Sequence, residues 1–402
     1  MPSRILCALI LLLFLPGIYL TLADWLPSPH QEDLGAYFVA ARALAEGESP
    51  YDARVAERLA ADAGIEYHSP YIYPPLLAIL LRPLTFLPYS AAAAVWFALS
   101  AGALLAALWL LRPFTGLPWR VYRWLCAAAF FLPPVHHTLE HGQITNFLFL
   151  LIVGGAVGNT GSGALVGFAA ALKVFPATLA AVYALSGRLA ALGTMVAGAA
   201  VLTLAGALAA PAATLDFLRR VGPQLALERR LAPNNQSLDA VMARWFETHW
   251  FVTPIIHAPG VGRIASQLGS AIVIGLTLWA LVTVRRKEGE AAQAGRFALA
   301  VAATLIVSPI VWDHYYVLLL LPVAVLYRGS GDNAVRLLLL AGAALLLSHR
   351  YWPLTFAMKS PVFMSSGMAG VVVLWIALLK VLRYDRVCAV RPPPSDTRPS
   401  AT

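Results

Sequence analysis

Residues 164–185 read ALVGFAAALKVFPATLAAVYAL, an apolar run whose one charged side chain is Lys173. About 20 apolar residues make a helix that can cross a bilayer. As a single span, this run places Arg188 outside the cell and the polar loop near residues 211–260 inside. As two half-helices that meet near Lys173 and Pro176, it leaves Arg188 in the cytoplasm and that loop outside. We favour the second interpretation because it agrees with the positive-inside rule, and a broken helix is tolerated where it lines a polar cavity.

Comparable apolar runs recur along all 402 residues, of which 59% are hydrophobic and 12% charged. A soluble domain carries roughly 25% charged residues, and no long polar segment exists here to form one. We therefore predict an all-α polytopic membrane protein with about 12 transmembrane or half-spanning helices. Residues 1–385 form the membrane domain, and residues 386–402 form a disordered cytoplasmic tail rich in Pro and Arg.

The expected spans alternate with two long outer loops, at about residues 24–89 and 211–263. The first loop contains a helix that we expect to lie on the membrane surface and to end at Gly47. The first span fits either a cleaved signal peptide or a retained anchor, and we favour the anchor because a polytopic chain needs no separate export signal. The approximate spans outside the broken segment are 5–23, 90–111, 124–134, 147–157, 189–210, 264–284, 297–311, 316–327, 334–348 and 362–381.

The formal net charge of +9 comes from Lys and Arg residues that stand between apolar runs. This distribution indicates positive-inside topology and contact with anionic lipid headgroups rather than nucleic acid. The three cysteines, Cys7, Cys126 and Cys388, have no spacing typical of a disulfide or metal framework. Metal ligation by His136, His137 and His141 likewise lacks a firm spacing, so we expect no metal.

Asp33 and Tyr37 stand four residues apart in the first outer loop and would share one helix face. A carboxylate that faces a cavity near lipid can act as general base toward a hydroxyl. Alternatively, Asp33 caps the helix start. Tyr71 and Tyr73 flank the interface further on, as an aromatic belt or as the wall of a lipid or sugar site.

Lys173 interrupts an apolar run too far from either end for its amine to reach a headgroup easily, which favours a functional role with a phosphate as partner. Asp313 and His314 directly follow an apolar run, where they fit either a phosphate or sugar site or a short wet loop. The remaining polar candidates are amides and one cation that suit hydroxyl or phosphate recognition but also ordinary turns. They are Gln143, Asn146, Asn235, Gln236 and Arg244.

Several motifs occur in a distinctive order along the chain: DLGAYFVAARALAEGESPYD, YIYPPLLAILLRPLTFLP, HGQITNFLFLL, GALVGFAAALKVFPATL, NNQSLDAVMARW and SPIVWDHYYVLLL. Together they resemble the GT-C glycosyltransferases of family 87, which are polyprenyl-phosphate-mannose-dependent mannosyltransferases. The likeness spans roughly residues 33–320. It implies a GT-C type fold and a polytopic enzyme that uses a lipid-linked monosaccharide on the outer face of the membrane.

The resemblance also implies a general base in the first outer loop. Asp33 matches that position by its spacing to Tyr37 and to the Gly-x-x-Pro-Tyr motif that begins at Gly47. The Lys-x-x-Pro motif of the family matches Lys173 and Pro176.

The Trp-Asp-His motif of the family matches Trp312, Asp313 and His314. Family members often carry a second His after the first, and here that residue is Tyr315. The detailed role of the pair is therefore open in this chain.

These residues suit an inverting transfer of a sugar, mannose in most of the family, from a polyprenyl phosphate to a glycolipid or glycan. Asp33 is the expected base, and no metal is required because protein cations can hold the departing phosphate. We expect the enzyme in a bacterial cytoplasmic membrane, with its site on the outer side. The expected phosphate ligands are Lys173, His314 and Arg244. The expected sugar or acceptor contacts are Tyr37, Tyr73, Gln143, Asn146, Asn235, Gln236 and Asp313.

Two other functions are compatible with a polytopic chain. A lipid-linked sugar flippase or transporter would commonly show internal repeats and charges at mid-membrane in both halves, and we find no repeat. A polysaccharide polymerase or ligase would instead place the catalytic residues late in the chain, for example at His349 and Arg350.

Overall fold

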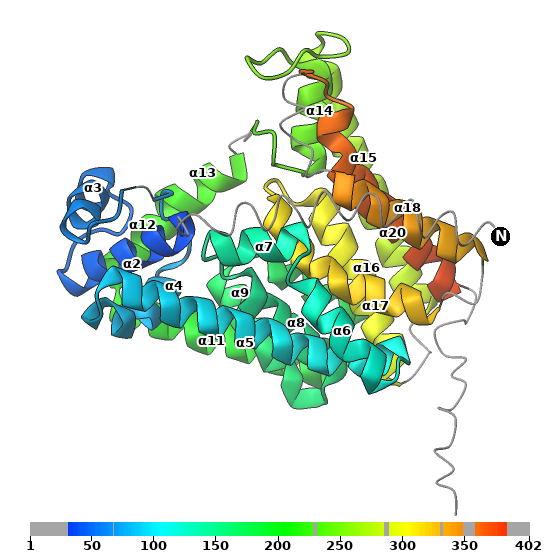
Figure 1. Cartoon of the computed structure of the whole chain (residues 1–402), viewed down its shortest axis with the longest axis horizontal. Helices are drawn as coiled ribbons and strands as arrows, with labels where there is room; N and C mark the ends of the chain where they lie inside the picture. The colour runs from blue at the N-terminus through cyan, green and yellow to red at the C-terminus, as the bar shows by residue number, and fades with distance from the viewer. Residues whose placement is uncertain are drawn as a thin grey trace, which may run out of the picture.

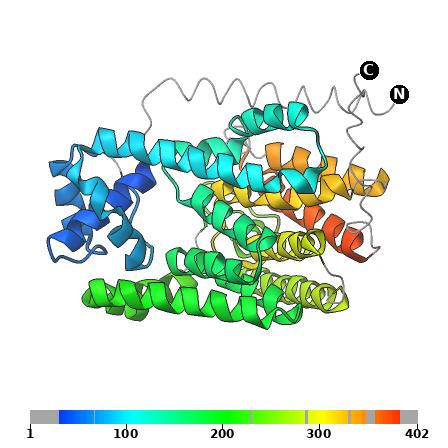
Figure 2. The same cartoon turned by 90° about the horizontal axis from the view of Figure 1, so that it is seen from below.

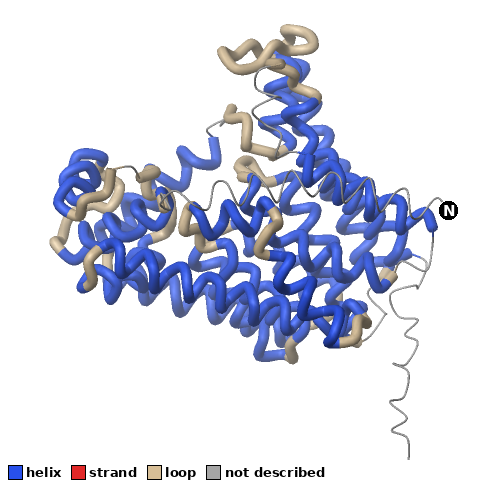
Figure 3. The backbone as a smooth tube through the Cα atoms, in the orientation of Figure 1, coloured by secondary structure: helices blue, strands red, loops and turns tan. Residues whose placement is uncertain are grey.

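The computed structural model describes most of the chain, and within the described residues every regular element is a helix (Figure 3). The expected first span, the C-terminal tail, His349 and Arg350 lie outside them. The described ranges are 31–66, 68–227, 231–284, 289–329, 333–348 and 358–383.

Five helices are long and apolar enough to cross a membrane, which supports a multi-helix membrane protein. The total of about 12 spans and half-spans stays a prediction. The five are α5 (Tyr89–Thr115), α11 (Leu189–Ala209), α15 (Pro259–Thr283), α16 (Glu290–Val307) and α20 (Ser366–Arg383), the last extended at its start to Phe363.

The shorter helices complete the framework seen in Figure 1. They are α2 (Glu32–Ala45), α3 (Ala53–Asp62), α4 (Pro75–Leu81), α6 (Trp119–Ala129), α7 (Pro133–Glu140), α8 (Thr145–Val157), α9 (Gly163–Leu172), α10 (Ala180–Leu185), α12 (Pro211–Asp216), α13 (Gly222–Leu227), α14 (Leu238–Phe246), α17 (Leu320–Arg328) and α18 (Asn333–Ser348). Two 3₁₀ turns matter below: η3 (Phe175–Leu179) and η5 (Asp313–Leu319).

Four helices pack in the order α5, α8, α9 and α11, with α5 and α11 on opposite sides of the molecule (Figure 2). Glycines make the contact between α9 and α11 unusually close. A Cβ atom on Gly163 would lie 2.0 Å from the carbonyl oxygen of Ala191, and one on Gly167 would lie 2.2 Å from that of Met195. Small residues four apart allow helix backbones to approach in this way, so the glycines fix the position of α9.

The apolar run that contains Lys173 is broken, as the second interpretation of the sequence predicted. Helix α9 ends at Leu172, and Lys173 takes an extended conformation with φ −149° and ψ 125°. The chain then turns into η3, whose second residue is Pro176. Proline cannot donate a backbone hydrogen bond and clashes with the preceding turn of a helix, so the backbone leaves the helix at the lysine.

The expected span at residues 124–134 is wrong in its extent, because the chain breaks between α6 and α7. Helix α6 ends at Ala129, and the paired prolines Pro133 and Pro134 begin α7. Proline is well suited to the first turn of a helix, where its missing N–H has no partner to lose. Because of this break, α7 is a separate short helix, and it lies next to the candidate functional site described below.

Helix α2 does not lie on a surface as the sequence suggested. Nine of its residues are buried, including neighbours such as Tyr37, Phe38 and Val39 that point in different directions. Protein therefore surrounds most of the helix. Its C-terminal end is as expected, with Gly47 in the left-handed region at φ 76°.

The two long loops that the sequence predicts meet at the end of α12. The hydroxyl of Ser49 donates to Asp216 at 3.4 Å, and Arg220 donates to the same carboxylate at 2.7 Å. The rings of Tyr51 and Phe217 lie 6.2 Å apart across this contact. The first loop is thereby tied to the second, and Figure 1 shows α2 and α3 beside α12.

A polar cavity of about 500 Å³ lies at the far end of α8 from the site described below. Its lining includes Gly158, Arg188, Glu290, Gln293 and Arg296. The molecule therefore has polar groups at both ends of the α8–α9 pair.

The α9–α11 contact predicts opposite effects for two glycine substitutions. Gly167→Ala would place a methyl group against the Met195 carbonyl, so we expect a loss of about 1–3 kcal/mol of folding free energy. The matched control is Gly193→Ala on α11, where a Cβ meets nothing within 4 Å. There alanine should leave stability unchanged or raise it by up to about 1 kcal/mol. Thermal unfolding in detergent measures both, and equal melting temperatures would contradict this packing.

Candidate functional site

Asp33 stands in the first turn of α2, and its backbone is anchored to the end of α7. The N–H groups of Asp33 and Leu34 both donate to the carbonyl oxygen of His141, at 3.0 and 3.3 Å. The Asp33 carboxylate accepts from the Ser69 hydroxyl at 2.5 Å and from the Gln143 side-chain amide. The carboxylate therefore bonds to two side chains rather than serving as a helix cap.

Gln143 is the centre of this network and is 3% exposed. Its amide nitrogen donates to Asp33, and its amide oxygen accepts from the hydroxyls of Tyr37 and Tyr73, each at 3.1 Å. The preceding Gly142 has φ +65°, and a Cβ there would lie 2.7 Å from the Cβ of Leu34. Only glycine suits that turn, which brings the Gln143 amide against α2.

Both tyrosines stay protonated, and this fixes the direction of their hydrogen bonds. Burial is the first cause that raises the pKa of Tyr37 and of Tyr73, and the negative charge of Asp33 adds to it in each case. A neutral phenol donates its proton, so both hydroxyls point at the Gln143 oxygen. The rings meet edge to face at 5.1 Å, which holds the pair in place.

Lys173 extends this network from the break between α9 and η3. Its amine donates to the Tyr73 hydroxyl at 3.0 Å and lies 4.7 Å from the centre of the Tyr73 ring. It also lies 4.1 Å from the centre of the Tyr315 ring, which stacks on Phe175 at 5.6 Å. Cation–π contacts of this kind stabilise an ammonium group. Tyr315, which stands where the family often has a second His, therefore lies against the lysine amine.

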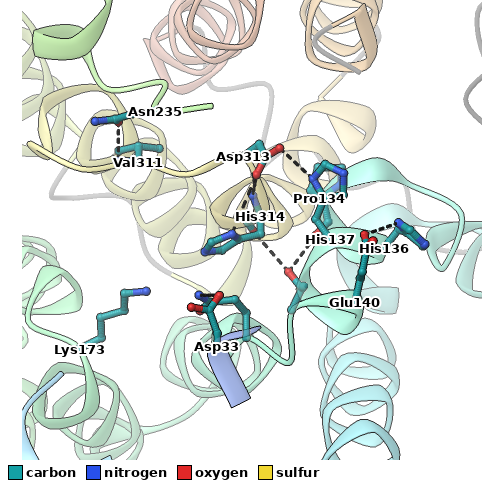
Figure 4. A network of polar contacts seen from close by, with 12 residues as sticks. Asp33, Pro134, His136, His137, Glu140, Lys173, Asn235, Val311, Asp313 and His314 are labelled. Atoms are coloured by element: carbon teal, nitrogen blue, oxygen red, sulfur yellow. Dashed lines mark hydrogen bonds and ion pairs between the residues drawn. The ribbon is translucent and has the colours of Figure 1, made fainter. Parts of the chain in front are cut away.

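The hydrogen bonds run in one direction from cation to anion. Lys173 donates to Tyr73, Tyr73 donates to Gln143, and Gln143 donates to Asp33. Such chains polarise their members and strengthen each bond. Figure 4 shows Lys173 and Asp33 on either side of one space with His314 next to it. The site thus presents a carboxylate and an amine together.

His314 and Asp313 begin η5 on the other side of this space. His314 is 6% exposed, and burial followed by the positive charge of Lys173 lowers the pKa of its imidazole. A neutral imidazole can still donate one hydrogen bond. The Asp313 carboxylate contacts the His137 Nδ1 at 2.8 Å and accepts from the backbone N–H of His314 at the same distance. Asp313 therefore joins α7 to η5.

Three of the predicted contact residues lie elsewhere than expected. Asn146 on α8 donates to the hydroxyl of Ser100 on α5 at 3.0 Å, inside the helix packing. The Asn235 oxygen accepts from the backbone N–H groups of Ser237 and Val311 at 3.1 and 3.0 Å. These contacts hold backbone and neighbouring helices together, and Figure 4 shows Asn235 with Val311 apart from Asp33 and Lys173.

The side chain of Gln236 also forms its hydrogen bonds with backbone groups. Its amide donates to the carbonyls of Pro233 and Met364 at 3.0 and 2.8 Å, and its oxygen accepts from the Met368 N–H at 3.2 Å. The residue has no exposed surface. Gln236 therefore joins the second long loop to the start of α20.

Arg244 likewise differs from its expected role as a phosphate ligand. It is fully buried, and its guanidinium donates to the carbonyls of Ala232, Asn235 and Met364 at 2.8, 2.7 and 3.4 Å. Burial lowers its pKa to about 10, so it stays charged at neutral pH. The charge therefore holds the second outer loop in place.

Sequence reasoning missed two residues of the site. Ser69 stands in the Pro- and Tyr-rich stretch before Tyr71, where nothing but the fold shows that its hydroxyl reaches Asp33. His137 was considered only for metal ligation, and the structure pairs it with Asp313. His136 and Glu140 lie close to His137 and bring three potential metal ligands together on α7.

Comparison with known proteins identifies the family of the chain. The model of glycosyltransferase family 87 matches residues 71–309. A polyprenol-phosphate-mannose-dependent alpha-(1-2)-phosphatidylinositol mannoside mannosyltransferase of Mycolicibacterium smegmatis is 27% identical over 325 residues, which cover 73% of this chain and 68% of the relative.

Two further relatives carry similar descriptions. A polyprenol-phosphate-mannose-dependent alpha-(1-2)-phosphatidylinositol pentamannoside mannosyltransferase of the same organism is 28% identical over 338 residues, covering 81% and 77% of the two chains. A phosphatidylinositol mannoside mannosyltransferase of Mycobacterium tuberculosis is 27% identical over 378 residues, covering 84% and 81%. No solved structure gives a significant match.

The position of Arg244 predicts a structural phenotype for its loss. Arg244→Met removes the donor to three backbone carbonyls, so we expect a loss of about 3–5 kcal/mol of folding free energy. The control is Arg263→Met, because Arg263 is exposed. Thermal unfolding of both variants tests this. A variant at position 244 that unfolds like the wild type but binds donor poorly would instead restore the phosphate-ligand hypothesis.

Proposed function

Because the chain belongs to glycosyltransferase family 87, and so is a glycosyltransferase, we propose that it transfers mannose from a polyprenyl phosphate to a hydroxyl group of a glycolipid or glycan. The observation that carries this proposal is the chain of hydrogen bonds from the Lys173 amine through Tyr73 and Gln143 to the Asp33 carboxylate. It keeps a base and a cation in one site, which is what the reaction needs.

In this mechanism Asp33 is the general base. The acceptor oxygen attacks the anomeric carbon of mannose while its proton moves to the Asp33 carboxylate, opposite the departing phosphate. The bond between the anomeric carbon and the phosphate oxygen breaks, and its electron pair leaves with the polyprenyl phosphate. One displacement of this kind inverts the anomeric configuration. Ser69 and Gln143 orient the carboxylate for the proton transfer.

Lys173 and His314 act on the opposite partner, the phosphate. The lysine amine supplies a positive charge, and the buried neutral imidazole of His314 supplies a hydrogen-bond donor. The His314 Nε2 is buried without a hydrogen-bond partner among the described residues, which suits an atom that meets a ligand. With these groups present, the transfer step requires no metal ion.

The side of the membrane follows from charge placement. Arg112 at the end of α5 and Arg120 and Arg123 in α6 cluster around the junction of the two helices, and such clusters stay in the cytoplasm. That end of α5 is the far end from Tyr89, which donates to the backbone of Gln31 next to α2. We therefore propose that the site opens on the outer face of a bacterial cytoplasmic membrane.

The acceptor is proposed from the relatives. Their names specify phosphatidylinositol mannosides as acceptors, and a mannosylated inositol lipid in the outer leaflet would reach a site built next to the bilayer. Family membership leaves the flippase and polymerase alternatives without support.

The base assignment predicts a large loss of rate for Asp33→Asn. Asparagine keeps the size of the side chain but cannot take up a proton, so transfer should fall by about 10²–10⁴-fold while the protein still folds. The assay follows radiolabelled mannose from a polyprenyl-phosphate donor to lipid. Asp62→Asn on the exposed face of α3 is the matched control. Near-wild-type transfer by Asp33→Asn would remove Asp33 from the mechanism.

The phosphate assignment predicts that Lys173→Ala raises the KM for the donor more than the KM for the acceptor. The amine attracts the departing phosphate of the donor, whereas the reacting group of the acceptor is a neutral sugar hydroxyl. Arg54→Ala serves as the control because it removes an exposed cation from the same outer region. If both KM values rise equally in the Lys173 variant, the lysine has a structural role instead.

A further inference from the structure

Helix α7 carries three metal-ligand side chains that converge beside the site. His136, His137 and Glu140 each offer one ligand atom, and these atoms all lie within 4.8 Å of one another. His136 is almost fully buried, while Glu140 is one-third exposed. Figure 4 shows His136 next to Glu140 on one side of α7, and His137 directed toward Asp313 of η5. We propose that they bind a divalent transition-metal ion, for which zinc is the best match.

The spacing suits such an ion. His136 and Glu140 are one helical turn apart, and the His136 Nδ1 lies 3.4 Å from the Glu140 Oε2. Ligands about 2.1 Å from a tetrahedral zinc ion are about 3.4 Å from one another, so this pair already has the required separation. The ligand atom of His137 lies within 4.8 Å of the other two. To reach the separation of about 3.4 Å, it has to move closer to them by no more than about 1.4 Å.

The donor set determines the class of metal. Two imidazole nitrogens and one carboxylate oxygen suit zinc and neighbouring transition metals, whereas magnesium and calcium prefer oxygen ligands alone. Three protein ligands leave one position of a tetrahedral zinc for water. An alkaline-earth ion is therefore a poor match for this cluster.

The surroundings of His137 suit a ligand that binds the metal through Nε2. A histidine that ligates a metal usually gives its other ring nitrogen to a carboxylate, which fixes the orientation of the ring. The His137 Nδ1 contacts the Asp313 Oδ2 at 2.8 Å. Asp313 is itself held by the backbone N–H of His314, so the ring orientation is set from η5.

A metal at this place would not bind the substrate. It would stabilise the segment from His141 to Gln143, which positions Asp33. The cluster ends at Glu140, and the next residue, His141, accepts the backbone N–H groups of Asp33 and Leu34. Gln143 follows two residues later and donates to the Asp33 carboxylate. An ion that fixes the last turn of α7 would therefore fix the groups that orient Asp33.

The test measures metal in the full chain, purified without a histidine tag, incubated with zinc and then dialysed. We expect about one zinc per chain by elemental analysis, and a chelator should lower the melting temperature by several degrees until zinc is returned. His136→Ala should lose both the bound zinc and the response to chelator. His257→Ala is the matched control, since that histidine lies on an exposed loop beside Thr248.

A second variant, Glu140→Gln, keeps the shape of the side chain in case the alanine variant fails to fold, and it should weaken zinc retention at least tenfold. The proposal is overturned if the wild type retains no zinc and shows no response to chelator. It is equally overturned if His257→Ala loses the same zinc as His136→Ala, or if Glu140→Gln retains zinc as well as the wild type, because the ion would then be adventitious. These readouts do not depend on the proposed transfer reaction.

Discussion

The hydrogen bond from the Gln143 amide to the Asp33 carboxylate is the contact on which the rest of the site depends. It joins α2 to the turn between α7 and α8, and the other end of the same amide gathers two tyrosine hydroxyls. A buried network of this kind is stable only when each member has a partner. Because Tyr73 also accepts from Lys173, one amide sets the base, the aromatic wall and the cation relative to one another.

Several features of the fold and of the candidate site could be predicted from short stretches of the sequence. The break at Lys173 follows from a proline three residues later and a charge in an apolar run. The end of α2 follows from a glycine with positive φ. Asp33, Tyr37, Tyr73, Gln143 and Lys173 were each named from the sequence pattern or from the resemblance to family 87, and the structure brings all five together.

The rest depended on contacts that no local pattern reveals. Asn235, Gln236 and Arg244 carry the same donors whether they face a substrate or a backbone carbonyl. Each of the three also has a partner at least 76 residues away, near Val311 or Met364, so only the tertiary fold could assign them. The burial of α2 was missed because its residues repeat a helical pattern that suits either a bilayer surface or a protein groove.

The lengths of α8 and α9 fix how deeply the reaction centre is set. These helices have 13 and 10 residues, which correspond to a rise of about 20 and 15 Å. The two helices separate the polar cavity at Arg188 from Gln143 and Lys173 at their other ends. Both helices are shorter than the hydrocarbon core of a bilayer, which is about 30 Å thick. If that cavity lies at one lipid–water boundary and both helices run along the bilayer normal, the level of Gln143 and Lys173 is roughly 10–15 Å below the opposite boundary. A bilayer that thins around this part of the protein would lower its headgroups toward them, so hydrophobic mismatch would itself bring the phosphate of a prenyl lipid within reach.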